Sequence, residues 1–154
     1  MIEEARAVKA VLAGTGVPLV INDRVDVALA AGADGVHVGQ DDMPVVEARA
    51  LVGSDRLIGL SASTAPELRD VAGADYVGVT AFSTPTKGDA IAGGLELLRA
   101  AARTLVVPWF AIGGIELANV SEVVAAGAPG VAVVRAVRDA ADPEAAARML
   151  RRAL

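Results

Sequence analysis

Short valine-rich runs recur along the chain, and each follows an alanine-rich stretch that ends in glycine. Residues 31–38, 72–79 and 126–133 share this order. The glycine falls where the end of a helix needs a positive φ, and the apolar run after it is typical of a buried strand. Residues 13–21 and 52–60 make the same join through a longer loop. The pattern therefore predicts repeated helix-to-strand joins.

About six strands are expected on this pattern, with helices between and around them. The strands fall near residues 17–22, 35–38, 57–61, 75–79, 107–112 and 130–134. The last helix is the best marked, because Asp142 can cap it and Pro143 suits its first position. Strands that alternate with helices imply an α/β fold built from parallel βαβ units. A doubly wound sheet and a (β/α) barrel both fit this alternation.

The composition narrows the class of protein. The chain has 154 residues, 54% of them hydrophobic, which predicts one folded domain over residues 1–154. Nineteen acidic residues face 14 basic ones and aromatics make up 3%, so we expect no nucleic-acid partner. The chain has no cysteine, begins with an acidic segment and lacks an apolar run of about 18 residues. We therefore expect no membrane partner and a cytoplasmic location.

Polar side chains follow several of the predicted strands where each strand ends. Asn22 and Asp23 follow the first strand, Asp42 follows the second, and Ser61 ends the third. In parallel α/β folds such loops gather on one face, where ligands bind. Two carboxylates on adjacent strand ends suit Mg²⁺, which takes one or two carboxylates together with substrate phosphates. The alternative is that Asp23 caps a helix beginning at Arg24 and Asp42 caps the next helix.

Two further loops suit an anionic ligand. Residues 83–88 are rich in hydroxyls and end in Lys-Gly, although an ordinary surface turn would also explain them. Gly113 and Gly114 let backbone N–H groups approach a ligand, and a helix starting near Glu116 would point its N-terminus at a phosphate. A phosphate site after the late strands favours a barrel over a Rossmann sheet, whose GxGxxG fingerprint is absent.

The remaining candidates are expected in the core. His37, the one histidine, lies inside a predicted strand and fits a hydrogen-bonded core histidine better than a catalytic one. Trp109 and Phe110 lie in the hydrophobic fifth strand and are expected to be buried. No Ser/His/Asp triad can be assembled from the chain.

Taken together, these motifs resemble the thiamine phosphate synthases. Five segments stand in the order seen in that family: 17–23 (VPLVIND), 32–42 (GADGVHVGQDD), 59–62 (GLSA), 84–87 (TPTK) and 111–115 (AIGGI). The resemblance runs from about residue 5 to the C-terminus. It implies a TIM barrel that couples a pyrimidine pyrophosphate to a thiazole phosphate, which gives thiamine phosphate and pyrophosphate.

The resemblance also implies roles for particular residues. Asp23 and Asp42 match the family's Mg²⁺ ligands. Other positions match residues that bind the two small-molecule substrates: Asn22, Ser61 and Lys87 for the pyrimidine pyrophosphate, and Thr84, Pro85, Thr86, Gly114, Val134 and Arg135 for the thiazole phosphate. Lys87 and Ser61 are the expected catalytic residues. Lys87 and Mg²⁺ would neutralise the departing pyrophosphate while a pyrimidinyl-methyl cation forms, and the thiazole nitrogen would capture that cation.

Three departures from the family keep alternatives open. The family begins with two strands and an Arg- and Lys-bearing pyrophosphate clamp that this sequence lacks, so we expect about six of eight strands and low activity. The family commonly has His where Ser63 stands and Ser where Arg135 stands. The segment between Ser61 and Lys87 is a few residues short. A thiazole tautomerase, which depends on that His, and a non-catalytic phosphate-binding fragment are the alternatives.

Strands 17–22 and 130–134 would each lack a neighbour, which predicts self-association through open sheet edges.

Overall fold

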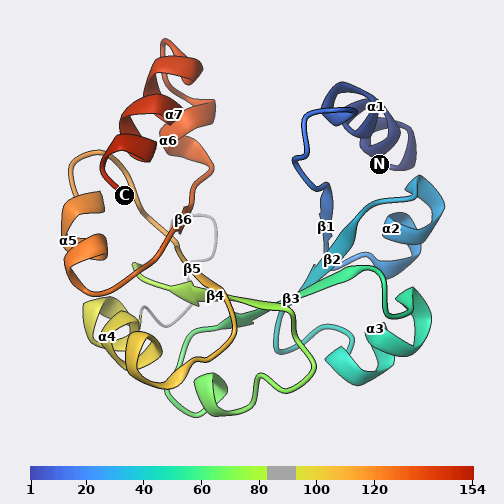
Figure 1. Ribbon diagram of the computed structural model, residues 1–154, viewed down its shortest axis with the longest axis horizontal. Coiled ribbons are helices and arrows are strands. Elements are labelled where there is room, and N and C mark those ends of the chain that lie inside the picture. The colour runs from blue at the N-terminus through green and yellow to red at the C-terminus, as the bar shows by residue number, and fades with distance from the viewer. Residues whose placement is uncertain (83–92) are drawn as a thin grey trace. The chain divides into compact units, whose positions relative to one another are not determined.

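Helices and strands alternate along the chain in the computed structural model, which describes residues 1–82 and 93–154 (Figure 1). The described residues contain six strands, in agreement with the sequence prediction. They form two compact units. The first comprises Met1–Ser61 and Val71–Tyr76, and the second comprises Ala62–Asp70 and Val77–Leu154.

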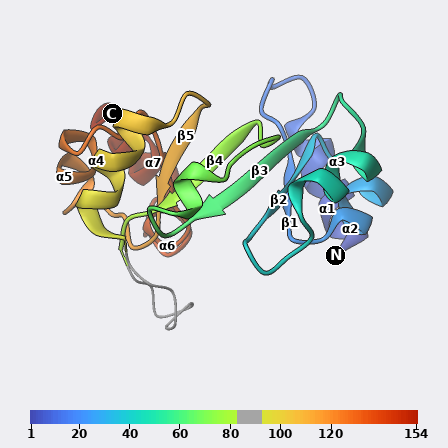
Figure 2. The same cartoon turned by 90° about the horizontal axis from the view of Figure 1, so that it is seen from below.

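The first unit contains three parallel strands and three helices. In chain order they are α1 (Ile2–Leu12), β1 (Val20–Asn22), α2 (Val25–Ala31), β2 (Gly35–Val38), α3 (Val45–Val52) and β3 (Leu57–Ala62, whose last residue belongs to the second unit). The strand β2 pairs with both β1 and β3, and His37 lies opposite Asn22 on one side and Gly59 on the other. The helix α2 contacts both α1 and α3, and all three helices are seen together in Figure 2.

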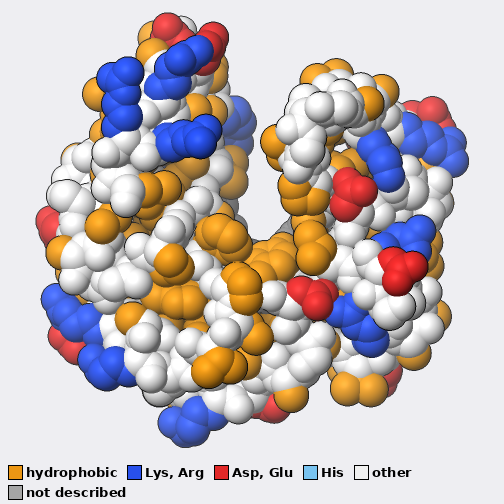
Figure 3. Space-filling view, in the orientation of Figure 1, with side chains coloured by type: hydrophobic (Ala, Val, Ile, Leu, Met, Phe, Trp, Pro, Cys, Tyr) orange, Lys and Arg blue, Asp and Glu red, His pale blue; other side chains and the backbone are white. Residues whose placement is uncertain are grey.

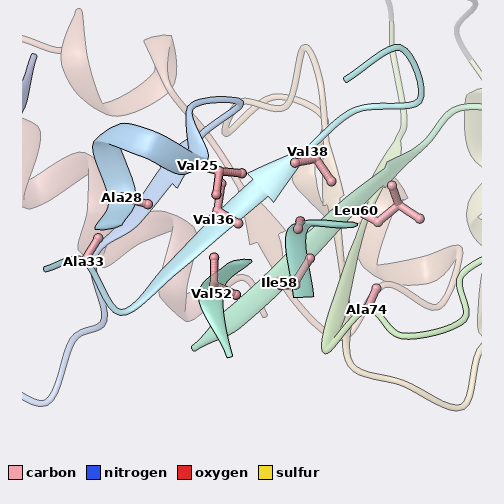
Figure 4. Packing of buried hydrophobic residues seen from close by; sticks show 10 residues of the cluster. Val25, Ala28, Ala33, Val36, Val38, Val52, Ile58, Leu60 and Ala74 are labelled. Carbon is pink, nitrogen blue, oxygen red and sulfur yellow. The ribbon is translucent and has the colours of Figure 1, made fainter. Parts of the chain in front are cut away.

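Small aliphatic side chains form the core of the first unit (Figure 4). Val36 and Val38 of β2 and Ile58 of β3 are fully buried, and they pack with Val25 and Ala28 of α2. Val36 and Val38 lie on one face of β2, whereas the partly buried His37 between them lies on the other face. This burial fixes where the strands end and the polar loops begin.

The second unit follows the same plan. It contains the 3₁₀ helix η1 (Glu67–Arg69), β4 (Tyr76–Thr80, whose first residue belongs to the first unit), α4 (Gly94–Thr104), β5 (Trp109–Ile112), α5 (Val120–Ala125), β6 (Val131–Ala132), α6 (Arg135–Arg138) and α7 (Pro143–Arg152). The strand β5 pairs in parallel with both β4 and β6. Leu98 of α4, Val123 of α5 and Val79 of β4 are fully buried.

Two of the three repeated helix-to-strand joins, at Gly32 and Gly127, are confirmed, whereas at Gly73 a turn rather than a helix leads into the strand. Gly32, Gly73 and Gly127, the glycines of the three repeats, have φ values of 65°, 85° and 99°. Gly32 is the left-handed C-cap of α2, as predicted. The predicted cap of the last helix is also confirmed, because the Asp142 carboxylate accepts a hydrogen bond of 2.9 Å from the Ala145 N–H at the start of α7.

The strands lie near the predicted positions, although the first begins at Val20 and the last ends at Ala132. Three other local predictions are wrong. Between β3 and β4, where a helix was expected, the chain forms only the single 3₁₀ turn η1. The helix expected near Glu116 begins instead at Val120. Trp109 is buried as predicted, but Phe110 is 40% exposed, because neighbouring residues of β5 point to opposite faces.

Candidate functional site

Asn22 and Asp23 leave the carboxyl end of β1 and are both exposed. The Asp23 N–H donates to the His37 carbonyl at 2.7 Å, which ties this loop to β2. Asp23 has a φ of 62°, and in residues 1–82 and 93–154 it is the one non-glycine residue with a positive φ. Backbone strain of this kind clusters at functional sites, where the surrounding structure maintains it. The conformation of Asp23 therefore marks this strand end as a candidate site.

Asp42 lies in the loop that follows β2. Its Oδ2 accepts a hydrogen bond of 2.7 Å from the Gly39 N–H, so the carboxylate closes its own loop. The capping alternative for the two aspartates is wrong, because the N-cap positions of α2 and α3 are Arg24 and Pro44. Neither carboxylate caps a helix, and both lie in the loops that follow β1 and β2.

The donor set of Asp23 and Asp42 fits a magnesium ion that is shared with a phosphate ligand. Both carboxylates are exposed, and they follow neighbouring strands of one unit. Within the described ranges no group of three or more His, Cys, Asp or Glu side chains could hold a metal ion. A site with two protein carboxylates suits Mg²⁺, which keeps several waters and binds substrate phosphates, better than a cation that needs an all-protein cage.

Ser61, at the end of β3, belongs to a hydrogen-bonded cluster in the first unit. Its Oγ lies 2.9 Å from Nε2 of His37, and Nδ1 of His37 lies 3.1 Å from the Tyr76 hydroxyl. The Ser61 carbonyl accepts a hydrogen bond of 2.7 Å from the Gln40 side chain. The prediction that His37 is hydrogen-bonded is confirmed, but its side chain is partly rather than fully buried. Tyr76, beside His37, and Gln40, beside Ser61, were not predicted from the sequence.

Gly59 explains why these side chains fit together. A Cβ at this position would lie 2.2 Å from Cζ of Tyr76 and 2.3 Å from Nδ1 of His37. Both contacts are shorter than any that real Cβ atoms make, so only glycine leaves room for the two rings. The signal in the sequence is a glycine inside an apolar strand, opposite a histidine on the neighbouring strand.

The glycine pair of the second unit follows β5. Gly113 and Gly114 have φ values of 96° and 59°, and a Cβ on Gly113 would lie 2.6 Å from the Phe82 carbonyl oxygen. Asn119 holds the turn that follows, since its side chain donates to the Gly114 carbonyl and accepts from the Glu116 N–H, both at 2.9 Å. The turn occupies residues that we expected to be helical. The loop is therefore built around glycine conformations rather than a helix N-terminus.

Two more predicted positions follow β6 in the second unit. Val134 is 61% exposed and occupies the N-cap position of α6, and Arg135 is the first residue of that short helix. Both side chains are therefore accessible to a ligand. Thr84, Pro85, Thr86 and Lys87, together with the rest of the loop 83–88, lie outside the described residues.

Ser63 occupies the position where the family commonly has His. Its Oγ lies 2.8 Å from Oγ1 of Thr80, and its N–H donates to the Glu67 carboxylate at 2.7 Å. The position is therefore filled by a hydroxyl pair at the ends of β3 and β4, without an imidazole.

No described helix is long and apolar enough to cross a membrane.

Comparison with solved structures defines the class of fold. The thiamine phosphate pyrophosphorylase of Pyrococcus furiosus matches with a TM-score of 0.90 at 36% identity, covering 99% of this chain and 74% of that one. The N-(5'-phosphoribosyl)anthranilate isomerase of the same organism matches with a TM-score of 0.72 at 18% identity, covering 99% and 80%. The second likeness concerns the fold alone. The six βα strands are those of the (β/α) barrel class, as the sequence predicted.

Sequence comparison defines the family. Residues 1–137 match the family described as thiamine monophosphate synthase. The thiamine-phosphate synthase of Chloroflexus aurantiacus is 55% identical over 157 residues, which cover 98% of this chain and 71% of that protein. That of Xanthobacter autotrophicus is 50% identical over 158 residues, covering 100% and 75%. That of Thermosynechococcus vestitus is 52% identical, and the chain spans 44% of its length. The chain belongs to the thiamine monophosphate synthase family of transferases.

Proposed function

We propose that the chain acts in thiamine biosynthesis by coupling a pyrimidine pyrophosphate to a thiazole phosphate. The observation that carries the proposal is the strained backbone of Asp23, which holds a carboxylate at the end of β1, one strand away from Asp42. Membership of the family and its named relatives supports the reaction. The chain supplies no nucleophile in this proposal, because the thiazole nitrogen forms the new bond while pyrophosphate leaves.

The first unit binds the pyrimidine pyrophosphate in this proposal. Asp23 and Asp42 would hold Mg²⁺, which when bound neutralises charge on the leaving pyrophosphate. The amide of Asn22 and the hydroxyl of Ser61 donate hydrogen bonds to the same anionic oxygens. The resemblance assigns a further positive charge on this substrate to Lys87, which lies outside the described residues and is not part of the first unit. These groups favour departure of pyrophosphate because they bind the separated anion more strongly than the intact ester.

The second unit binds the thiazole phosphate in this proposal. The glycine loop at Gly113 and Gly114 offers backbone N–H groups at a place where a side chain would clash with the Phe82 carbonyl. The exposed step from Val134 to Arg135 offers further N–H groups and a guanidinium. Thr84, Pro85 and Thr86 belong to the same substrate by resemblance. Binding of the phosphate would orient the thiazole nitrogen for attack.

Calorimetric titration with inorganic pyrophosphate, with and without Mg²⁺, tests the metal site. We expect Mg²⁺ to tighten binding and Asp23→Asn or Asp42→Asn to abolish that gain. Asn keeps an acceptor for the Gly39 N–H, so Asp42→Asn should leave the loop folded. Asp41→Asn is the matched control, because Asp41 is an exposed carboxylate in the same loop. Equal affinity with and without Mg²⁺ would refute the metal site.

A product assay separates an enzyme from a non-catalytic binder. The chain is incubated with both substrates and Mg²⁺, and thiamine phosphate is quantified by chromatography. Lys87→Ala should lower turnover more than it weakens binding of the thiazole phosphate, because the ammonium acts on the leaving group. Pyrophosphate binding without any product formation would favour the binding-fragment alternative.

We further propose that the chain self-associates in the cytoplasm through its terminal strands. Within its own unit β1 pairs with β2 only, and β6 pairs with β5 only, among the described residues. Hydrophobic side chains are visible at the surface in Figure 3. Val17 before β1 and Val134 after β6 are 56% and 61% exposed. Light scattering over a concentration series should reveal dimers or larger species, and a monomer at every concentration would refute the proposal.

A further inference from the structure

Three polar side chains of the first unit form a line that runs from Tyr76 through His37 to Ser61. The Tyr76 hydroxyl lies 3.1 Å from Nδ1 of His37, and Nε2 of His37 lies 2.9 Å from the Ser61 Oγ. Both nitrogens of the imidazole therefore have a hydroxyl partner. Ser61 has a proposed role at the pyrophosphate, whereas His37 and Tyr76 have none.

The packing holds the imidazole in one place. The two rings are tilted by 42° with their centroids 5.4 Å apart, and the missing side chain of Gly59 makes room for both. His37 and Gly59 are paired in the β2–β3 register, so the sheet itself sets the position of the ring. The Gln40 side chain donates to the Ser61 carbonyl at 2.7 Å and fixes the backbone that carries the serine hydroxyl.

The position of one proton decides what Ser61 can do. A neutral imidazole has one N–H donor and one nitrogen acceptor. If Nε2 carries the proton, the imidazole donates to the Ser61 Oγ, and the serine keeps its own proton for a ligand. If Nδ1 carries the proton, Nε2 accepts the serine proton and no donor remains for an anion. Burial raises the pKa of the Tyr76 hydroxyl, so the phenol is protonated at neutral pH and available as a donor to Nδ1.

We propose that His37 is a positioning residue that accepts a hydrogen bond from Tyr76 at Nδ1, donates from Nε2 to Ser61, and so directs the serine proton at an anionic substrate oxygen. The identity of that substrate rests on the proposed function, whereas the direction of the chain of hydrogen bonds does not. The arrangement resembles the way in which an orienting group fixes the tautomer of a histidine.

The tautomer can be measured directly because the chain has one histidine. In uniformly ¹⁵N-labelled protein at neutral pH, two-bond ¹H–¹⁵N correlations distinguish a protonated Nε2 from a protonated Nδ1. We expect the Nε2–H form. In Tyr76→Phe the phenol is gone, and we expect the two tautomers to mix. A spectrum of the intact protein that shows the Nδ1–H form would overturn the proposal, whatever the chain binds.

Isosteric variants test the consequence for binding, with Mg²⁺ and inorganic pyrophosphate as the probe. The amide nitrogen of Gln reaches the place of Nε2 and that of Asn reaches the place of Nδ1. We therefore expect His37→Gln to preserve affinity and His37→Asn to weaken it by about 10- to 100-fold, the effect of losing one hydrogen bond to a charged ligand. Ser61→Ala should cost as much, and Ser54→Ala, an exposed serine of the same unit, should cost nothing.

The double variant separates a relay from two independent effects. If His37 acts through Ser61, the combination of His37→Asn and Ser61→Ala should bind no more weakly than Ser61→Ala alone. Penalties that add would overturn the proposal, because His37 would then act on its own. If the intact chain binds no pyrophosphate, the proposed substrate is wrong, while the tautomer measurement still decides the relay.

Discussion

The Asp75 carboxylate ties β3 to the turn that precedes β4, and its removal should destabilise the first unit. Oδ2 of Asp75 accepts a hydrogen bond of 2.7 Å from the Ile58 N–H and one of 2.5 Å from Nη2 of Arg49. Asp34 occupies the same place in the preceding repeat, where its Oδ2 accepts from the Leu19 N–H at 2.8 Å. The two aspartates of the Gly-Ala-Asp repeats thus bind the backbone at or just before the start of the preceding strand.

The expected magnitude follows from burial. The Ile58 side chain is fully buried, so Asp75→Ala leaves its N–H without a partner at a cost of about 1–3 kcal/mol. In the ion pair, the side chain of Arg49 is 28% exposed and that of Asp75 is 40% exposed, so loss of the pair adds only about 0.2–1 kcal/mol. We expect a decrease of about 1–4 kcal/mol in the free energy of unfolding, which is the sum of these contributions. Asp34→Ala should cost about 1 kcal/mol, because Leu19 is only partly buried.

Urea unfolding followed by circular dichroism measures the global change, and amide hydrogen exchange at Ile58 measures the local one. A loss of about 2 kcal/mol corresponds to roughly 30-fold faster exchange at that amide. Asp75→Asn is the conservative variant, since it keeps an acceptor for Ile58 and should lose less than half as much. Asp41→Ala, at an exposed position, is the control. A cost for Asp34→Ala as large as that for Asp75→Ala would refute the burial argument.

Three further predictions concern single contacts. Asp142→Ala removes the N-cap bond of α7 and should cost about 1 kcal/mol in urea unfolding, with Asp142→Ser recovering most of it. Hydrogen bonds from Arg24 lower the pKa of Asp26 to about 2. The stability contribution of this pair is therefore present above pH 3.8 and is lost as the pH falls through 2. An NMR titration of Arg24→Gln should show the Asp26 midpoint rising toward 3.8. Gly59→Ala should cost about 1–3 kcal/mol by overpacking and should alter the His37 tautomer signal.

The regular part of the fold could be predicted from the sequence because its signals are local. Gly32, Gly73 and Gly127 marked the joins, and each has the positive φ that the pattern requires. Errors arose where a neighbouring segment decides the outcome. Asn119 folds back on Gly114 and delays the helix α5, and Phe110 lies on the exposed face of a strand whose other face is core. Neither the hydrogen bond of Asn119 nor the exposure of Phe110 can be recognised from the pattern of hydrophobic and polar residues.

In the candidate site, too, some residues could be predicted from the sequence and others could not. Asp23, Asp42 and Ser61 were predicted because polar residues that directly follow an apolar strand can be recognised in the sequence itself. Tyr76 was missed because its partner His37 is 39 residues away, and the two rings meet only in the folded unit, beside Gly59. The left-handed backbone of Asp23 could not be predicted either, because the sequence there reads as an ordinary polar turn.

In the proposed function, Asp23 is a position where folding and activity favour different amino acids. Its φ of 62° suits glycine or asparagine, which adopt this conformation at lower cost. Selection for stability alone would therefore enrich those two residues in a library randomised at position 23. Selection for Mg²⁺-dependent pyrophosphate binding would retain aspartate, whose carboxylate the proposed site needs. On the proposed function, the backbone angle of Asp23 would record a trade-off between stability and activity at a single residue.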